Sequence, residues 1–193
     1  MDEIKKLSEL SGEQVNQALD VFVEGFYNIF SGIIKDKAQI HRLFKNSFYY
    51  DMTYAYLQDG KAVAFMGLAD NNKRSLKLNK AVFFEILSGV AGKISYKAMR
   101  GALEELNITD PNGIVIDFLA TDPNHRSKGI GKKLIEFVRN LPNYKYIELE
   151  VFTKNPKAIK FYVREGFRAV GKKLDLLMVI QGAGRRIIMR LDK

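Results

Sequence analysis

Cysteine is absent from the whole chain of 193 residues. Its absence excludes a disulfide framework, a zinc site with thiolate ligands and a cysteine nucleophile. Long apolar runs are also missing. The first ten residues carry acids and lysines where a signal peptide has an apolar core, and no later stretch is long enough to span a membrane. From these absences we expect a cytoplasmic protein without membrane contact.

The remaining composition is that of a folded protein, with 47% hydrophobic and 27% charged residues. The length allows one substantial core but not two ordinary domains, and no repeat or linker divides the chain, so we expect one domain over residues 1–193. The formal net charge of +9 favours an anionic partner, either nucleic acid or a polyphosphate cofactor, although basic residues also keep a surface soluble. The sequence leaves homodimer formation open.

Apolar spacing in the first half of the chain indicates helices and a strand hairpin. The expected elements are a helix at 11–30, a helix at 37–46, a hairpin at 51–70 and one or two helices at 77–106. Ser11 and Gln14 have the spacing of a capping box at the start of the first helix. The basic segment 73–107, which includes the last helices, is the hardest to interpret.

The second half alternates strand and helix, which is the pattern of a parallel unit. The expected elements are a strand at 114–121, a helix at 129–138, a strand at 146–152, a helix at 156–165 and a closing hairpin of 168–180 with 185–191. The first of these strands is apolar except for Asp117, so we place it in the centre of the sheet. The chain is therefore predicted to have an α/β fold.

A glycine-containing loop, Asn124-His-Arg-Ser-Lys-Gly-Ile-Gly-Lys-Lys133, lies between a strand and a helix. The first N–H groups of a helix have no partner within the helix, and the helix dipole favours an anion there. Gly129 and Gly131 lack side chains that would keep phosphate oxygens away from these groups. Positive charge is added by Arg126, Lys128, Lys132 and Lys133. The loop is therefore a candidate phosphate site.

Three known phosphate-loop patterns compete for this stretch. A Walker A loop fails because Lys133 stands where serine or threonine is required. A dinucleotide fingerprint half fits: Leu134 replaces its third glycine, although Glu148 and Glu150 lie about twenty residues on, near where a ribose-binding acid is expected. The third pattern, Arg-x-x-Gly-x-Gly beginning at Arg126, fits at each position.

This third pattern resembles the signature with which the GNAT superfamily of N-acetyltransferases binds the pyrophosphate of acetyl-coenzyme A. The family's spacing in the preceding strand is matched by Leu119-x-Thr121-x-Pro123-x-x-Arg126. Its next strand and helix are matched by Leu149-Glu-Val151-x-x-x-Asn155-x-x-Ala158-x-x-x-Tyr162-x-x-x-Gly166-Phe167. Two ordered motifs at the right separation make the resemblance specific.

The resemblance covers about residues 113–172, extends loosely to the hairpin at 51–70 and does not reach 73–107. It implies a GNAT-like fold, with a mixed sheet of about six to seven strands flanked by helices and two splayed parallel strands in the centre. Residues 113–172 would be the acetyl-CoA-binding core. The segment 73–107, which precedes the central strand, would help to shape the acceptor side.

The resemblance also implies roles for individual residues. The backbone of Leu119, Ala120 and Thr121 would pair with the pantetheine arm, as a peptide strand would. The pyrophosphate would be held by Arg126, Ser127, Lys128, Gly129, Ile130, Gly131 and Lys132. Asn155 would bond the cofactor arm, cap the following helix, or do both. Tyr162 corresponds to the family's general acid, because a phenol with a pKa of about 10 is protonated at neutral pH; the alternative is packing beside Phe161.

The general base is left open between two carboxylates. Glu150 occupies the position where some ribosomal-protein N-terminal acetyltransferases have a catalytic glutamate, and we place it first. Asp117 is the other candidate because burial in an apolar strand would raise its pKa. Either could instead be structural, paired with a basic residue across the sheet. His41 and His125 stand apart in the sequence, and we expect no metal site.

The need for a base depends on the acceptor. Exposing the lone pair of a lysine-like amine at pH 7 costs about 4 to 5 kcal/mol, whereas an α-amino group costs about 1 kcal/mol. The resemblance implies acetyl transfer from acetyl-CoA to a primary amine of a small molecule or protein, and the basic bias of 73–107 argues mildly against a polycationic acceptor. The alternatives are an acyl-CoA sensor without turnover and a nucleic-acid-binding module, which the scattered lysines disfavour.

Overall fold

A computed structural model describes residues 2–104, 110–174 and 184–193. Its strands form one seven-stranded sheet in the order β1-β2-β3-β4-β5-β7-β6. The strands are β1 Glu3–Lys6, β2 Thr53–Gln58, β3 Lys61–Ala69, β4 Gly113–Thr121, β5 Tyr146–Phe152, β6 Arg168–Lys173 and β7 Arg186–Asp192. Only β4 and β5 pair in parallel, and every other pair is antiparallel. The predicted mixed sheet is confirmed.

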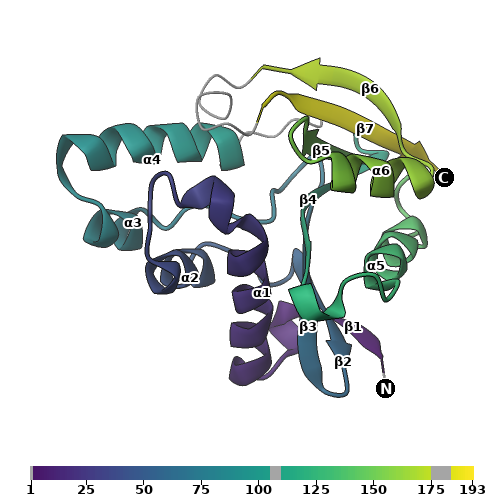
Figure 1. Ribbon diagram of the computed structural model, residues 1–193, viewed down its shortest axis with the longest axis horizontal. Helices are drawn as coiled ribbons and strands as arrows, with labels where there is room; N and C mark the ends of the chain where they lie inside the picture. The colour runs from purple at the N-terminus through teal and green to yellow at the C-terminus, as the bar shows by residue number, and fades with distance from the viewer. Residues whose placement is uncertain (1, 105–109, 175–183) are drawn as a thin grey trace.

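Helices cover both faces of the sheet (Figure 1). They are α1 Gly12–Phe30, α2 Lys37–Lys45, α3 Lys80–Ile86, α4 Gly89–Glu104, α5 Ile130–Arg139 and α6 Pro156–Arg164, with short 3-10 turns at Leu7–Glu9 and Pro123–His125. One apolar core lies under α1 to α4, and the other lies between the sheet and helices α5 and α6. Both β3 and β4 contribute to both cores: in β4, Ile114 and Ile116 belong to the second core, and Phe118 and Ala120 belong to the first.

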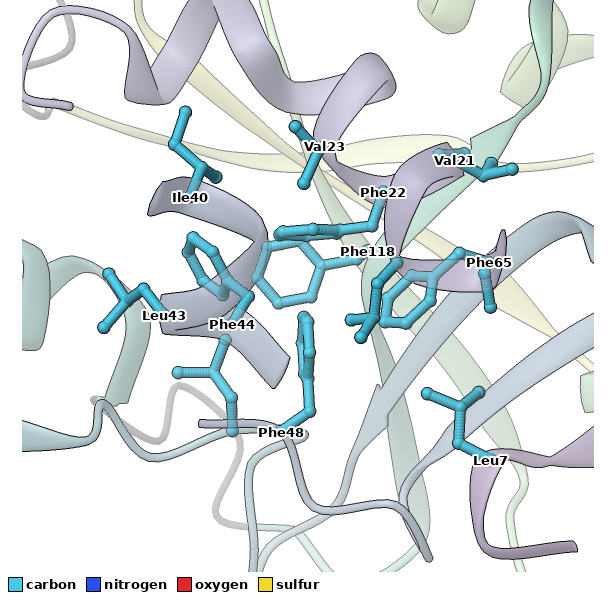
Figure 2. Packing of buried hydrophobic residues seen from close by; sticks show 14 of the residues in the cluster. Leu7, Val21, Phe22, Val23, Ile40, Leu43, Phe44, Phe48, Phe65 and Phe118 are labelled. Carbon is cyan, nitrogen blue, oxygen red and sulfur yellow. The ribbon is translucent and has the colours of Figure 1, made fainter. Parts of the chain in front are cut away.

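The first core is built around the fully buried ring of Phe22 in α1. This ring lies 4.7 to 5.8 Å from six other phenylalanine rings. Figure 2 shows Phe44 and Phe48 approaching it from α2 and the segment after it, and Phe65 and Phe118 from the sheet. The predicted capping box at the start of α1 is confirmed, because Ser11 and Gln14 exchange side-chain and backbone hydrogen bonds.

The basic segment differs in detail from the sequence-based expectation. Within the described part of this segment no helix begins before Asn79, whose side chain accepts a hydrogen bond from the N–H of Val82 and caps α3. A break at Leu87 and Ser88 then separates α3 from α4. The end of this segment at 105–107, and the predicted hairpin turn within 175–183, lie outside the described residues. Sequence patterns also missed β1, which is short and polar and joins the sheet through its backbone.

Strands β4 and β5 separate from each other within the sheet. Their parallel pairing runs from Gly113 and Tyr146 to Ile116 and Leu149. Both strands continue beyond this point, β4 to Thr121 and β5 to Phe152. The register of β4 against β3 also shifts at this point, leaving Asp117 as the extra residue of a β-bulge. The expected splay is therefore present, and it opens a space in the middle of the sheet.

None of the helices in the described parts of the chain is both long and apolar enough to cross a membrane.

Candidate active site

The glycine loop leads from the end of β4 into α5. Ser127 and Gly129 both have left-handed backbone angles, with φ of 63° and 79°. Gly129 is the N-cap of α5 and supplies no side-chain hydrogen bond to the helix, so the first N–H groups remain available to an anion. The Nε of Arg126 donates to the carbonyl oxygen of Thr121 at 3.2 Å, which ties the loop to β4. The exposed side chains of the loop are Asn124, Arg126, Ser127, Lys128, Lys132 and Lys133.

Glycine is required at the two positions of the loop for different structural reasons. A Cβ on Gly129 would meet nothing within 4 Å, so its positive φ is what requires glycine. A Cβ on Gly131 would lie 3.0 Å from the ring of Phe161, so its absence lets α5 approach α6. Between them, Ile130 is buried in the core and anchors the helix start, which leaves only its backbone N–H to face an anion.

Lys133 does not add its charge to the loop as the sequence analysis expected. Its Nζ lies 2.8 Å from Oδ2 of Asp2 and 2.7 Å from the hydroxyl oxygen of Tyr56. These contacts raise the pKa of Lys133, the bond to Asp2 being the largest cause. His125 is likewise held by Asp122, whose Oδ1 lies 2.9 Å from its Nδ1. Within the described residues, no group of three or more histidines and acids could hold a metal ion.

The space opened by the splay is a cavity of about 240 Å³. Its walls come from both strands of the splay, from α1 and α4 on one face of the sheet and from α6 on the other. The predicted site residues that line it are Asp117, Leu119, Glu150, Asn155 and Tyr162. Ala120, Thr121 and the glycine loop do not line it. The structure therefore joins the two matched sequence blocks at one cavity, with the loop placed beside it.

The edge of β4 that faces β5 is open beyond Ile116. Leu119, Ala120 and Thr121 pair with β3 on their other side, opposite Met66, Phe65 and Ala64. Because no described strand pairs with the open edge there, its backbone groups are available to an extended ligand. The side chain of Ala120 points instead toward α1, where a Cβ on Gly25 would come within 2.7 Å of it. The geometry is that of a missing strand in the centre of the sheet.

One face of α6 borders the cavity. Asn155, Ala158 and Tyr162 all line it, at a spacing that places them along one side of the helix. The Oδ1 of Asn155 accepts a hydrogen bond from the N–H of Ala158 at 3.1 Å, so the capping role is realised. Burial raises the pKa of Tyr162 above that of an ordinary phenol, and its ring also contacts Phe161 and Phe167. Tyr162 therefore keeps its proton at neutral pH and can donate it.

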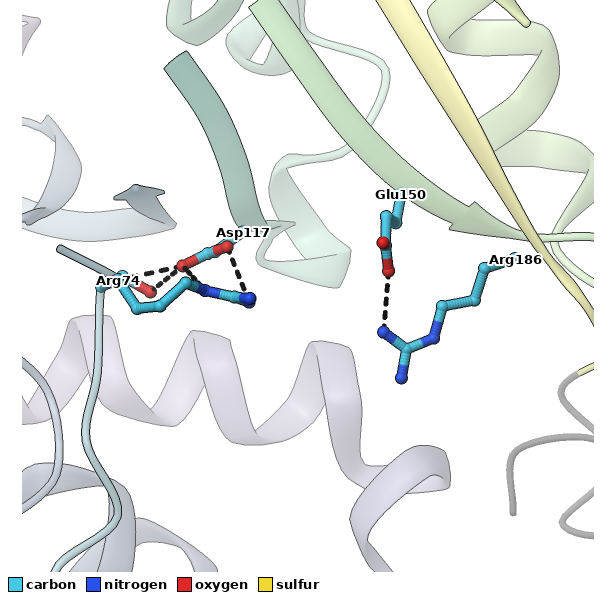
Figure 3. Close-up of polar contacts among 5 residues, drawn as sticks. Arg74, Asp117, Glu150 and Arg186 are labelled. Atoms are coloured by element: carbon cyan, nitrogen blue, oxygen red, sulfur yellow. Dashed lines mark hydrogen bonds and ion pairs between the residues drawn. The ribbon is translucent and has the colours of Figure 1, made fainter. Parts of the chain in front are cut away.

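Three carboxylates of the splayed strands line the cavity, Asp117, Glu148 and Glu150. Figure 3 shows two of them, Asp117 and Glu150, each with its own arginine. Asp117 is 1% exposed, and its Oδ1 lies 2.9 Å from Nη2 of Arg74. Its Oδ2 accepts from the backbone N–H of Ser75 at 3.1 Å and from the hydroxyl of Ser75 at 2.7 Å. Burial raises the pKa of Asp117, and the contacts to Arg74 and Ser75 oppose that shift. Both oxygens of Asp117 are thus engaged in holding the segment before α3 against β4.

Glu150 is more accessible than Asp117. Its side chain is 21% exposed, and its Oε2 accepts from Nη1 of Arg186 in β7 at 2.7 Å. The sequence analysis allowed each carboxylate a basic partner, and the structure shows one for both. It did not identify Arg74 or Arg186 as these partners, because neither belongs to a motif.

Comparison with known proteins agrees with this geometry. The sequence matches the model of the acetyltransferase (GNAT) family over residues 22–167. It is also 36% identical, over 80 residues and 39% of this chain, to a probable spermine N(1)-acetyltransferase of Bacillus subtilis subsp. natto (strain BEST195). The match spans only about half, 53%, of the length of that curated relative.

Solved structures share the fold over nearly the whole chain. An N-acetyltransferase from Staphylococcus aureus Mu50 is 14% identical with a TM-score of 0.62, over 98% of this chain and 100% of that one. The ribosomal-protein-S18-alanine N-acetyltransferase from Escherichia coli is 15% identical with a TM-score of 0.56, over 100% of this chain and 94% of that one. Because the family match runs from α1 through α6 and takes in the splay, the loop and Tyr162, this chain belongs to the acetyltransferase (GNAT) family.

Proposed function

We propose that this protein transfers the acetyl group of acetyl-CoA to a primary amine. The observation that carries the proposal is the cavity at the splay, which is bordered by Tyr162 on one side and Glu150 on the other and adjoins a glycine loop at a helix start. Acetyl-CoA supplies the activated acyl group. The chain supplies binding groups, a proton donor and a proton acceptor around one enclosed space.

The residues fit the parts of acetyl-CoA in order. The N–H groups at the start of α5, with the exposed basic side chains of residues 126–132, suit the pyrophosphate. The open edge of β4 at Leu119 to Thr121 suits the amide groups of the pantetheine arm. The side chain of Asn155 borders the same cavity and can serve both the helix cap and the arm. The thioester end would then lie at the splay, beside Tyr162.

Two residues are assigned to proton transfer. The amine nitrogen forms a bond to the thioester carbonyl carbon, and the carbon–sulfur bond breaks. Glu150 accepts the proton that the amine loses, directly or through one water molecule. Tyr162 donates its proton to the departing sulfur, and its raised pKa keeps the phenol protonated at neutral pH until then. Asp117 is assigned to structure, because both of its oxygens are held by Arg74 and Ser75.

The first experiment compares thermal unfolding with CoA, acetyl-CoA, NAD and ATP. A ligand at about 100 times its dissociation constant stabilises a protein by about 2.7 kcal/mol, so CoA and acetyl-CoA should raise the melting temperature clearly. Release of free thiol with a panel of amines then measures turnover. Stabilisation by NAD but not by CoA would contradict the proposal. Binding of acetyl-CoA without thiol release from any amine would favour the acyl-CoA sensor.

The remaining expectations about the whole protein stay predictions. They are the single domain over residues 1–193, the cytoplasmic location, the placement of 73–107 on the acceptor side and the absence of a nucleic-acid partner. Arg74 lies before α3 in that segment, and Met99, Ala102 and Leu103 of α4 line the cavity, which supports the acceptor-side placement.

A further inference from the structure

The part of the cavity that lies under α1 and α4 is apolar. Helix α1 contributes Phe26, Ile29 and Ile33, which share one side of the helix or its continuation, and α4 contributes Met99 and Leu103, one turn apart. The α6 wall of the cavity, by contrast, carries Tyr162 and Asn155 and adjoins the glycine loop. An amine that attacks a thioester held on the α6 side must therefore approach past the α1 and α4 wall.

Each carboxylate that lines the cavity is paired with an arginine, although Arg190, the partner of Glu148, does not itself line it. Asp117 is paired with Arg74, Glu150 with Arg186, and Glu148 with Arg190 at 2.7 Å. Every carboxylate that lines the cavity in the described residues thus already faces a guanidinium. A second ammonium group of an acceptor would have to enter this space without a surplus carboxylate, and burying an uncompensated charge is costly.

We propose that the acceptor is a monoamine with an apolar body, such as an alkyl or aryl group, rather than a polyamine. This inference rests on the proposed acetyl transfer and names its substrate class. The apolar body packs on Phe26, Ile29, Ile33, Met99 and Leu103 while its amine reaches the splay between Glu150 and Tyr162.

The test compares hexylamine with 1,6-diaminohexane, two acceptors of similar length that differ in a terminal methyl or ammonium group. Initial rates of thiol release from acetyl-CoA give kcat/KM for each. We expect hexylamine to be the better acceptor by about tenfold or more, which is the discrimination an apolar pocket typically provides. Phenylethylamine should resemble hexylamine, and spermine should resemble 1,6-diaminohexane.

A charge placed in the wall should change this preference. Ile29→Glu introduces a carboxylate on the α1 side of the cavity, so the ratio of hexylamine to 1,6-diaminohexane should fall about tenfold or more. Ile94→Glu is the matched control, since Ile94 lies on α4, is 66% exposed and does not line the cavity. Its ratio should equal that of the wild type. If circular dichroism shows that Ile29→Glu does not fold, Leu103→Ala replaces it. This variant should raise the KM for hexylamine and leave the KM for 1,6-diaminohexane unchanged.

The results distinguish a failure of this inference from a failure of the proposed acetyl transfer. A wild type that prefers 1,6-diaminohexane or spermine would overturn the inference and leave acetyl transfer intact. Preferred use of hexanoyl-CoA over acetyl-CoA with a small polar amine such as ethanolamine would show that the wall holds an acyl chain, which also overturns it. Absence of both acetyl-CoA binding and thiol release would contradict the proposed function itself, and the inference would fall with it.

Discussion

The chemistry proposed for this protein depends on the surroundings of one phenol. Tyr162 lies on the face of α6 that borders the cavity, one turn beyond Ala158 and two beyond Asn155. Its ring packs between Phe161 and Phe167, with centroid distances of 5.2 and 5.6 Å. Packing and proton donation are compatible here, because the same burial that fixes the ring also keeps its hydroxyl protonated.

Replacing Tyr162 by phenylalanine should separate these two roles. Tyr162→Phe keeps the ring and removes the hydroxyl, so kcat should fall about 100-fold, the usual contribution of a general acid. The dissociation constant for acetyl-CoA should stay nearly unchanged. Steady-state kinetics and calorimetric titration measure the two quantities. Tyr144→Phe serves as control, because Tyr144 is a partly buried tyrosine that bonds Asp70 and does not line the cavity. Equal losses in rate and affinity would make Tyr162 a packing residue.

The pKa of Tyr162 can be followed directly by absorbance of tyrosinate. Titration of the wild type and of Tyr162→Phe should give the same tyrosinate absorbance up to about pH 10, the ordinary pKa of a phenol. Only above that pH should the wild type show the absorbance of one additional ionised tyrosine. The native state keeps this proton while the unfolded phenol loses it. The free energy of unfolding should therefore fall as pH rises above about 10, and less steeply in the variant. A difference between the two curves below pH 10 would contradict the raised pKa.

Single residues also show the limits of reading a motif. The spacing of Asn155 and Tyr162 predicted that they share one side of a helix, because positions on one side repeat every three or four residues. The partner of Lys133 was not readable, since Asp2 lies at the other end of the chain. Glu150 and Asp117 looked equivalent in sequence, and only their exposure and the partners of their oxygens distinguish them.

At the scale of elements, the contact between α5 and α6 connects the glycine loop to the helix that carries Tyr162. Gly131 permits this contact, because any Cβ there would lie 3.0 Å from the ring of Phe161. Gly129 has a separate task, since its φ of 79° sets the start of α5. The two glycines of the loop thus serve helix packing and backbone geometry, in addition to the anion site proposed for the loop.

The two glycines should respond differently to alanine. Gly131→Ala should weaken acetyl-CoA binding, because Phe161 must move and α5 shifts relative to α6. Gly129→Ala should cost about 1 to 2 kcal/mol in the free energy of unfolding, the usual cost of a left-handed residue with a Cβ. Urea unfolding and calorimetric titration distinguish these effects. The double variant Gly131→Ala with Phe161→Leu should recover part of the affinity, and a lack of any recovery would contradict the packing explanation.

Elements were predictable where their signals are local. Spacing within one segment was enough to predict the capping box of α1 and the helix of residues 156–164. It was also enough to predict the alternation of strand and helix from β4 to α6. Strand β1 and the true start of α3 were missed. Strand β1 is held by backbone pairing with β2, and the stretch before α3 is held by Ser47 and Glu104, which accept from the N–H groups of Asn79 and Leu78. Such partners lie far away in the sequence.

At the scale of the whole molecule, Phe22 connects the helices of one face to the sheet. Its ring contacts rings from α1, from α2 and from strands β3 and β4. The same group of aromatic residues supports the α1 wall of the cavity, since Phe26 packs against both Phe22 and Phe118. The α1 wall of the cavity and the core are therefore parts of one packed unit.

Removing this central ring should destabilise the protein strongly. Phe22→Ala should lower the free energy of unfolding by about 3 to 5 kcal/mol, because it leaves a cavity among closely packed rings. Urea denaturation measures the change. Val163→Ala provides the comparison, since Val163 is 57% exposed and should change stability by less than about 0.5 kcal/mol. Similar losses in the two variants would contradict the central position of Phe22.

By itself, the sequence determined the glycine loop at a helix start, the order of strands and helices around it and the spacing of Asn155 and Tyr162. These features depend on neighbours within a few residues, where backbone periodicity and capping act. The tertiary structure decided the splay, the cavity and its charges. Arg74 reaches Asp117 across 43 positions, and Arg186 reaches Glu150 across 36. No sequence period records such contacts, because strand pairing and helix packing create them only when the sheet is assembled.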